Sequence, residues 1–154
     1  MISIRKANAA DAATIYTLRN RAILDNCADL YSPQQLTLWT EGELSQSFVD
    51  DIANNFYVSE INGQVIGSGK ITLSTTMIDA IFVDPDYFGR GAAKLMMSFL
   101  EDIAIQHNLN CLTLDSTLNA APFYQSCGFV GEDVSDYQSP RGVSLSCIRM
   151  HKIL

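Results

Sequence analysis

Residues 81–95 read IFVDPDYFGRGAAKL, and this stretch decides the fold that the sequence predicts. It begins as an apolar strand and stops at Asp84-Pro85, because proline cannot donate to a sheet ladder. It then passes through a loop with Gly89 and Gly91, which let the backbone come close to a ligand, into an amphipathic helix. Free N–H groups at a helix start lie at the positive end of its dipole, so the stretch predicts a phosphate-binding loop.

Two other classes of phosphate-binding loop do not fit this stretch. A Walker loop needs Gly-Lys followed by Ser or Thr, whereas the sequence offers Gly91-Ala92-Ala93-Lys94. A dinucleotide-binding fingerprint needs a third glycine where Lys94 stands. In that class the strand before the loop lies near the N-terminus of the fold, whereas the strand before this loop, at residues 81–83, does not. The loop therefore belongs to a different class of phosphate-binding protein.

A second informative stretch is residues 119–129, NAAPFYQSCGF, which begins 28 residues after Gly91. It predicts a short helix from Asn119 to Cys127. Gly128 can end this helix, since glycine readily adopts the left-handed conformation after a last turn. A helix and a strand are expected between the two stretches.

Together the two stretches resemble the GNAT (GCN5-related) N-acetyltransferase family. Its coenzyme loop follows a V-x-P strand end with [QR]-x-x-G-x-[GA], and residues 83–85, Gly91 and Ala93 match that pattern. The F-Y-x-x-x-G-F ending is intact at residues 123–129. Phe88 departs from the family, because glutamine or arginine is usual there, and we expect one side-chain contact to be weakened or rearranged. Within the family the chain is similar to small bacterial acetyltransferases of undefined acceptor.

The resemblance implies one GNAT domain over residues 1–154, with a mixed α/β fold. Its twisted, mostly antiparallel central sheet of six or seven strands is flanked by helices on both faces. Acetyl-CoA, the acetyl donor, is expected in the cleft between the fourth and fifth strands. No metal is expected, because the four cysteines lack the C-x-x-C spacing of a zinc site.

The family motifs also imply which residues bind the coenzyme. The backbone of one strand offers hydrogen bonds to the pantetheine arm, from Ile81, Phe82 and Val83. The loop holds the pyrophosphate with Phe88, Gly89, Arg90, Gly91, Ala92 and Ala93. Asn119 reaches the pantetheine, and Tyr124 stands near the sulfur.

Acetyl transfer from a thioester needs a neutral amine, stabilisation of an oxyanion and a proton for the departing thiolate. A backbone N–H of the strand ending at Val83 could serve the oxyanion. The Tyr124 hydroxyl could protonate or hydrogen-bond the sulfur; its alternative role is packing in the core. Cys127 fits a small packing residue better than a nucleophile, since no basic or histidine partner adjoins it.

Asp79 is the first candidate for the general base. It interrupts an apolar strand, where a carboxylate is costly unless it faces a cleft or a partner. The alternative is an outward-facing polar residue on a half-exposed strand. Asp115 is the second candidate, with a turn or cap role as its alternative.

Composition limits the partners. The chain has 154 residues, 47% hydrophobic and 18% charged, with a formal net charge of −7. Such a charge repels polyanions, so binding to nucleic acid or acidic lipid is not expected. No apolar run approaches the roughly 18 residues of a membrane span, and no secretory signal is recognisable, so we expect a cytoplasmic protein.

Local patterns predict the other elements. Asp11 is expected to cap a first helix, and Ser32-Pro33 with Gln35 forms a capping box for a second. Asn62-Gly63 predicts a two-residue hairpin turn. The remaining predicted elements are a strand at Ile2 and Ile4, helices at 43–53 and 91–108 with Leu95, Phe99 and Ile103 on one face, and strands at 56–61, 65–73, 77–83, 111–114, from 129 onward and 143–152.

The acceptor is expected to be an amine on a small molecule, and the protein a monomer or homodimer. Two alternatives remain: an enzyme that acetylates a protein or peptide, and a non-catalytic acetyl-CoA-binding regulatory module. Tyr31 and Trp39 could line the acceptor site or belong to the core.

Overall fold

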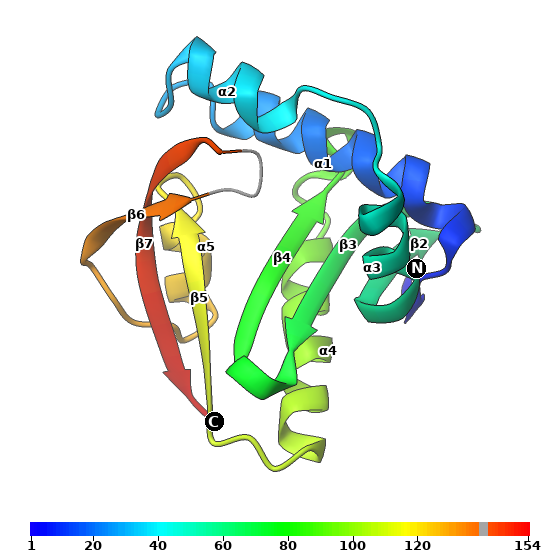
Figure 1. Ribbon diagram of the computed structural model, residues 1–154. Helices are drawn as coiled ribbons and strands as arrows, with labels where there is room; N and C mark the ends of the chain where they lie inside the picture. Colours follow the sequence, from blue (N-terminus) through cyan, green and yellow to red (C-terminus); the bar gives the residue numbers. More distant parts are fainter. Residues whose placement is uncertain (139–141) are drawn as a thin grey trace.

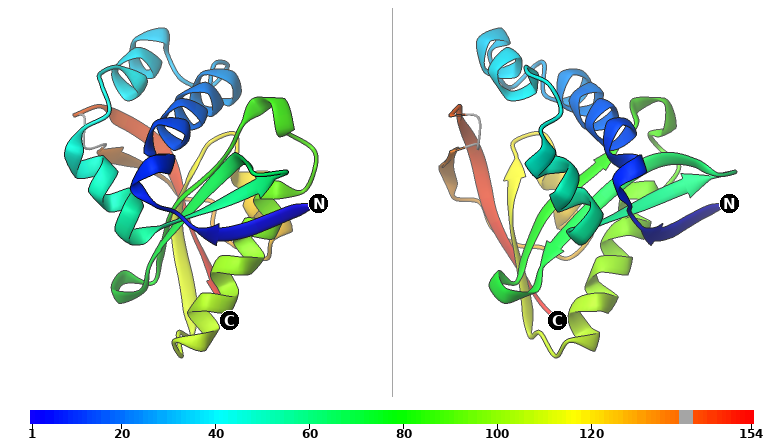
Figure 2. Two further views of the ribbon diagram at one scale, coloured as in Figure 1. Left: turned by 90° about the vertical axis from the view of Figure 1, so that its right-hand side faces the viewer. Right: turned by 45° about the vertical axis from the view of Figure 1, so that its right-hand side comes forward.

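The computed structural model describes residues 1–138 and 142–154. These residues form a seven-stranded sheet with helices packed against both faces (Figures 1 and 2). The strands are β1 Ile2–Lys6, β2 Phe56–Ile61, β3 Gln64–Thr72, β4 Met77–Val83, β5 Cys111–Thr117, β6 Val134–Gln138 and β7 Ser144–Ile153. The α-helices are α1 Ala12–Asn26, α2 Pro33–Thr40, α3 Gln46–Asn55, α4 Ala92–Gln106 and α5 Ala121–Ser126, and the 3₁₀ turns are η1 Ala9–Asp11, η2 Leu73–Thr75 and η3 Pro85–Tyr87.

The strand order is β1-β2-β3-β4-β5-β7-β6, and β4 with β5 is the one parallel pair in this described sheet. Helix α4 connects these two strands, because a parallel connection has to carry the chain back to the end where the first strand began. The expected mixed α/β fold, with a mostly antiparallel sheet and helices on both faces, is confirmed.

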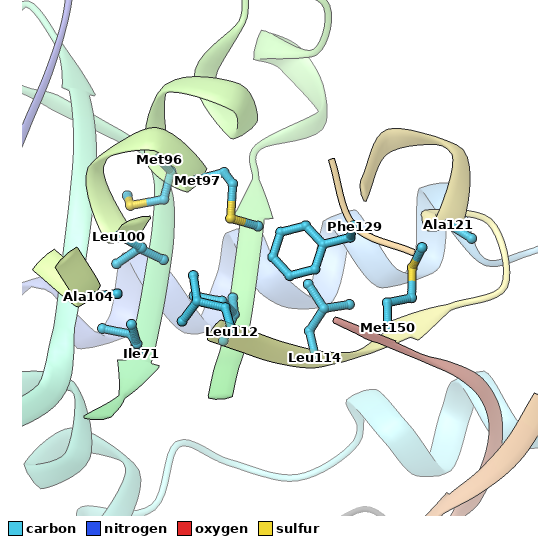
Figure 3. Close-up of a cluster of buried hydrophobic side chains, with 11 residues drawn as sticks. Ile71, Met96, Met97, Leu100, Ala104, Leu112, Leu114, Ala121, Phe129 and Met150 are labelled. Carbon is cyan, nitrogen blue, oxygen red and sulfur yellow. The ribbon is translucent and has the colours of Figure 1, made fainter. Parts of the chain in front are cut away.

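One hydrophobic core lies between the sheet and helix α4 (Figure 3). Leu112 and Leu114 alternate along β5 and so point to the same face, where Leu100 and Ala104 of α4 meet them. The buried members of this core are Ile71, Ile78, Met96, Met97, Leu100, Ala104, Leu112, Leu114, Ala121, Phe129 and Met150. Since they come from β3, β4, β5 and β7, this core joins the two halves of the sheet.

Helices α1, α2 and α3 cover the opposite face (Figure 2). Ile15 and Leu18 of α1 pack with Ile52 of α3 and Val58 of β2. Helix α2 packs against the other half of the sheet, where its side chains join a separate hydrophobic cluster that includes Leu145 of β7. The α1–α2 region therefore covers both halves of the sheet on this side.

Two local predictions are confirmed in detail. Asn62 and Gly63 have φ of 50° and 79°, as a tight hairpin between β2 and β3 requires. At the start of α2, the Ser32 hydroxyl accepts from the Gln35 N–H at 3.1 Å. The Gln35 side chain accepts from the Ser32 N–H at 2.9 Å, which completes the capping box.

Two predictions about helix starts need correction, although Asp11 does stand at the N-cap position of α1. The Asp11 side chain makes no capping hydrogen bond to α1, because its carboxylate accepts from Arg5 at 2.8 and 2.9 Å, and the side chain of Asn8 caps the preceding turn η1. The Arg5 hydrogen bonds also hold the pKa of the Asp11 carboxyl below its usual value. Helix α3 begins at Gln46 rather than Glu43, because Ser45 caps it by accepting from the Phe48 N–H at 3.2 Å.

Two strand boundaries also differ. Strand β5 continues past Leu114 to Thr117, because β7 supplies a partner at each of its positions. The strand expected from residue 129 onward is reduced to one bridge between Val130 and His151, and β6 begins only at Val134. Gly131, with φ of 146°, lies so close to β7 that a Cβ there would be 2.2 Å from the Arg149 carbonyl oxygen.

The buried face of α4 is rotated from the predicted one. Leu95 is 42% exposed, whereas Leu100 is completely buried. Leu100→Ala should lower the free energy of unfolding by about 2–5 kcal/mol, because it leaves a cavity in the joining core. Leu95→Ala, the same change on the same helix, should alter it by about 0.5 kcal/mol or less. Urea denaturation of both variants tests the assignment, and equal losses would contradict it.

Candidate active site

Strands β4 and β5 separate almost as soon as they meet. They share one residue pair, Met77 with Thr113, next to a hydrogen bond of 2.8 Å from the Thr113 N–H to the Thr76 carbonyl. Beyond this point the two ribbons diverge toward their carboxyl ends (Figure 1). Strand β5 is paired with β7 on its other side, and β4 with β3. The facing edge of β4 up to Val83 therefore has no strand partner among the described residues, although backbone polar groups need partners.

Asp79 occupies a β-bulge just after the strands separate. Ile78 pairs with Ile71, and Ala80 with Lys70, so Asp79 is the extra residue on β4. A bulge redirects the side chain at this position, which explains how a carboxylate is exposed on an otherwise apolar strand. Its Oδ2 atom accepts a hydrogen bond from the Thr72 hydroxyl.

The predicted phosphate loop has unengaged amides. Gly89 and Gly91 have φ of 78° and 82°, and Gly91 precedes the first turn of α4. The first backbone bond of α4 runs from the Leu95 N–H to the Gly91 carbonyl at 3.0 Å. The N–H groups of residues 91–94 donate to no acceptor within the described chain. They form a set of free donors at the positive end of the helix dipole.

The side chains of the loop leave room beside these amides. A Cβ at Gly89 or Gly91 would have no other atom within 4 Å, so the space there is open. Arg90 lies over the Tyr87 ring, 5.0 Å from its centroid. Phe88 is 39% exposed and offers an apolar ring where the family pattern has a polar side chain. Anion binding here would thus depend on the backbone amides.

Tyr124, on α5, is a protonated phenol at neutral pH. Its ring packs edge-on against Phe123 and Phe129, with centroids 5.2 and 6.1 Å away. Burial of its hydroxyl raises the pKa of Tyr124 to about 12. Among the described residues the contacts of its side chain are ring contacts and not hydrogen bonds, so the hydroxyl can donate to a ligand atom.

Asn119 and the cysteines have clear local roles. Asn119 precedes α5, and its side-chain carbonyl accepts a hydrogen bond of 3.3 Å from the Cys27 thiol. Burial raises the pKa of Cys27 to about 11, so this residue stays a thiol donor. Burial also raises the pKa of Cys127, which supports its interpretation as a packing residue, because a reactive cysteine needs a lowered pKa.

Asp115 does not have the expected turn or cap role. It lies within β5 opposite Arg149 of β7, and the two side chains form hydrogen bonds of 2.5 and 3.2 Å. Its carboxylate is therefore already paired with a cation, which weakens its candidacy as a base. The pair arises from the register of β5 with β7, and the sequence carries no local signal for it.

Tyr137 of β6 was not recognised from the sequence. Burial raises the pKa of the Tyr137 hydroxyl, and the carboxylates of Asp115 and Asp79 raise it further. These carboxylates come from β5 and β4, on the two sides of the strand divergence. By strand register, Tyr137 of β6 and Asp115 of β5 lie on the same face of the sheet as Leu145 of β7, which packs with α2.

Tyr31 and Trp39 belong to the core, which was one of the two roles predicted for them, the other being to line the acceptor site. Both are buried, and their rings meet edge-on with centroids 5.7 Å apart. The Tyr31 hydroxyl donates to the Ser146 carbonyl at 2.6 Å and accepts from the Leu118 N–H at 3.1 Å. Tyr31 therefore ties the segment before α2 to β7 and to the end of β5.

Residues 1–138 and 142–154 show neither a metal-binding cluster nor a membrane-spanning helix. They contain no group of three or more His, Cys, Asp or Glu side chains arranged to hold a metal ion. In the same residues, no helix has the length and apolar character needed to cross a membrane.

Comparison with known proteins agrees with this geometry. The family model "Acetyltransferase (GNAT) domain" matches residues 27–153. An uncharacterized N-acetyltransferase, YafP of Escherichia coli K12, is 30% identical over 128 residues, which cover 83% of this chain and 81% of YafP.

Solved structures of similar fold include the following. A GCN5-related N-acetyltransferase from Rhodopseudomonas palustris superposes with a TM-score of 0.90 at 25% identity, over 99% of this chain and 95% of its own. The PaiA N-acetyltransferase of Thermoplasma acidophilum, solved with coenzyme A, gives a TM-score of 0.78 at 18% identity. The match covers 100% of this chain and 99% of PaiA. The acetyltransferase yncA of Salmonella typhimurium, solved with acetyl-CoA, gives a TM-score of 0.71 at 22% identity. The match covers 99% of this chain and 94% of yncA.

The fold and the diverging strands thus define a class of acyl-CoA-binding α/β proteins. Within that class, the chain belongs to the GNAT acetyltransferase family. It is an acetyl-CoA-dependent N-acetyltransferase.

The open space at Gly91 allows a direct test of the coenzyme loop. Gly91→Glu should abolish coenzyme A binding, because it adds bulk and negative charge beside the free amides. Gly63→Glu is a matched control: Gly63 also has positive φ and open space, but it lies in the β2–β3 hairpin. Both changes carry a similar backbone strain of about 1–2 kcal/mol. Isothermal titration calorimetry with coenzyme A should show loss of binding in the first variant alone; undiminished binding by Gly91→Glu would contradict the placement.

Proposed function

We propose that the protein transfers an acetyl group from acetyl-CoA to the primary amine of a small molecule, by direct attack of the amine on the thioester. The observation that carries this proposal is the combination of an unpaired β4 edge with four unengaged amides at the start of α4. A linear coenzyme can use both, with its diphosphate at the amides and its pantetheine along the strand.

The coenzyme is assigned to specific parts of the chain. The loop of residues 88–93 holds the pyrophosphate through backbone N–H groups, which suit an anion at a helix start. The pantetheine amides hydrogen-bond the free edge of β4 at residues 81–83, much as a neighbouring strand would. Asn119 reaches the same arm from the segment before α5.

Tyr124 stabilises the leaving sulfur. As the C–N bond forms and the C–S bond breaks, negative charge develops on the sulfur. A phenol with a pKa of about 12 remains protonated at neutral pH and donates a hydrogen bond to that charge. Complete transfer of the phenolic proton to a thiolate would be uphill, since an ordinary thiol has a pKa of about 8.5. The role of Tyr124 is therefore mainly that of a hydrogen-bond donor.

Asp79 accepts the proton of the acceptor amine, directly or through water. An alkylammonium, with a pKa of about 10.4, first releases one proton to solvent, and Asp79 accepts the second proton, which the nitrogen loses as the C–N bond forms. The bulge on β4 exposes the Asp79 carboxylate next to the point where β4 and β5 separate. A backbone N–H on the free edge of β4 stabilises the oxyanion of the acetyl group.

Two features favour a small, cationic acceptor. Asp79 places an exposed carboxylate beside the point where β4 and β5 separate, and the chain, whose sheet is covered on one side by α1 and α2, has a net charge of −7. On that side, α2 is tied to β7: the Gln35 side-chain amide donates to the Ser144 carbonyl at 3.2 Å, and the Tyr31 hydroxyl donates to Ser146. A segment fixed in this way limits the room for an extended peptide.

Tyr124→Phe should lower kcat by about 10- to 100-fold, the value of one hydrogen bond to a charged group. The KM for acetyl-CoA should change little, because the hydroxyl acts on charge that develops during the reaction. Tyr57→Phe on β2, another partly buried tyrosine packed against the α4 core, is the control and should keep full activity. Equal kcat for wild type and Tyr124→Phe would remove Tyr124 from the mechanism.

The acceptor class can be determined by scanning free amines and peptides with acetyl-CoA and measuring thiol release. We expect release that depends on an added small amine. Release with lysine peptides or peptide N-termini alone would instead identify a protein acetyltransferase. Coenzyme binding without release in any assay would identify a non-catalytic acetyl-CoA-binding module.

A further inference from the structure

Two carboxylates stand at the turn that leads from β4 into the coenzyme loop, and one arginine from α1 pairs with both. Arg21 Nη1 lies 2.9 Å from Asp84 Oδ1, and Arg21 Nη2 lies 3.2 Å from Asp86 Oδ1. The Asp84 side chain is 13% exposed, whereas that of Asp86 is 71% exposed. An arginine of α1 therefore pairs with both carboxylates of the turn that precedes the loop.

Asp84 also fixes the shape of this turn. Its N–H donates to the Ile66 carbonyl at 2.8 Å, which anchors the end of β4 to β3. Its carboxylate accepts from the Asp86 N–H at 2.9 Å, and its carbonyl accepts from the Tyr87 N–H at 2.8 Å. The 3₁₀ turn η3 that follows continues directly into residues 88–91. Asp84 thus orients the loop, but it does so with a negative charge.

That charge is unfavourable for a coenzyme that carries a diphosphate. Asp84 and Asp86 stand on the turn between β4 and the loop that the diphosphate is proposed to occupy, and like charges held near one another repel. Arg21 offsets the two carboxylates while it holds them in place. Without it, the cations of this segment would be Arg90 and Lys94, both on exposed residues.

We propose that Arg21 is a positioning residue for coenzyme binding, which neutralises Asp84 and Asp86 and fixes the turn that presents the coenzyme loop. This inference rests on the proposed placement of the coenzyme diphosphate. It assigns to α1, a helix on the acceptor side of the sheet, a direct influence on the donor site.

The test compares Arg21→Met with Arg5→Met by calorimetric titration of coenzyme A at 0.05 M and 0.5 M salt. Arg5 also pairs with two carboxylates, Asp11 and Glu60, but it lies on β1, away from the loop. Arg21→Met should raise the Kd for coenzyme A about five- to tenfold at low salt. The ratio to wild type should fall to about twofold at 0.5 M, because salt screens repulsion from the exposed Asp86 carboxylate and part of that from Asp84. Arg5→Met should leave the Kd unchanged.

Rescue separates charge from simple loss of structure. Asp86→Asn added to Arg21→Met removes one unpaired charge and should restore part of the affinity, whereas Asp86→Asn alone should not weaken binding. Arg21→Lys should lie between Arg21→Met and wild type. In steady-state assays with an accepted amine, Arg21→Met should raise the KM for acetyl-CoA and leave kcat nearly unchanged.

The outcomes are distinguishable from failure of the proposed function. An unchanged Kd in Arg21→Met, or a deficit that neither salt nor Asp86→Asn reduces, would overturn the role of Arg21. Wild-type protein that does not bind coenzyme A would overturn the proposed function itself. If Arg21→Met does not fold, Arg21→Lys and Asp86→Asn carry the same comparison.

Discussion

The structure depends on a sheet ladder that is interrupted at one place. Strands β4 and β5 share the Met77–Thr113 pair and then separate, although continued pairing would satisfy the backbone of both. The hydrophobic core between the sheet and α4 compensates for the missing backbone hydrogen bonds between β4 and β5. Leu100 of α4, Leu112 of β5 and Ile78 of β4 belong to one buried cluster, so the two halves of the sheet stay joined through side chains (Figure 3). The opening is therefore a stable part of the fold.

This constraint separates the chemical roles in space. Free amides of residues 91–94 lie at the end of β4 and suit the anionic part of the coenzyme. The exposed carboxylate of Asp79, on a bulge of β4 next to the strand divergence, is the proposed base for the acceptor amine. Tyr124 belongs to α5, which packs with the core beside β5. The donor and acceptor can thus reach the same opening from different directions, which direct transfer without a covalent enzyme intermediate requires.

The parts of the fold that depend on neighbouring residues could be predicted from the sequence. The Asn62-Gly63 turn, the Ser32 capping box and the glycine loop before α4 all depend on the chemistry of a few adjacent positions. Asp11 stands at the predicted N-cap position of α1, but its carboxylate binds Arg5 on β1, a partner outside the helix that local sequence does not indicate.

The candidate site could be predicted only in part, for the same physical reason. The coenzyme loop is contiguous, and its motif is readable. The pairing of Asp115 with Arg149 and the contact of Arg21 with Asp84 depend on strand register and helix packing over many residues. Asp79 was recognised as an unusual carboxylate, but the bulge that exposes it is visible only in the pairing of β3 with β4.

The most direct test of the central claim is a titration with coenzyme A, followed by the amide signals of ¹⁵N-labelled protein. The account predicts that the N–H groups of residues 91–94, together with those on the free edge of β4, show the largest shifts and become protected from exchange with solvent. If these amides are unmoved while the coenzyme binds, the diphosphate lies elsewhere, and the account is contradicted.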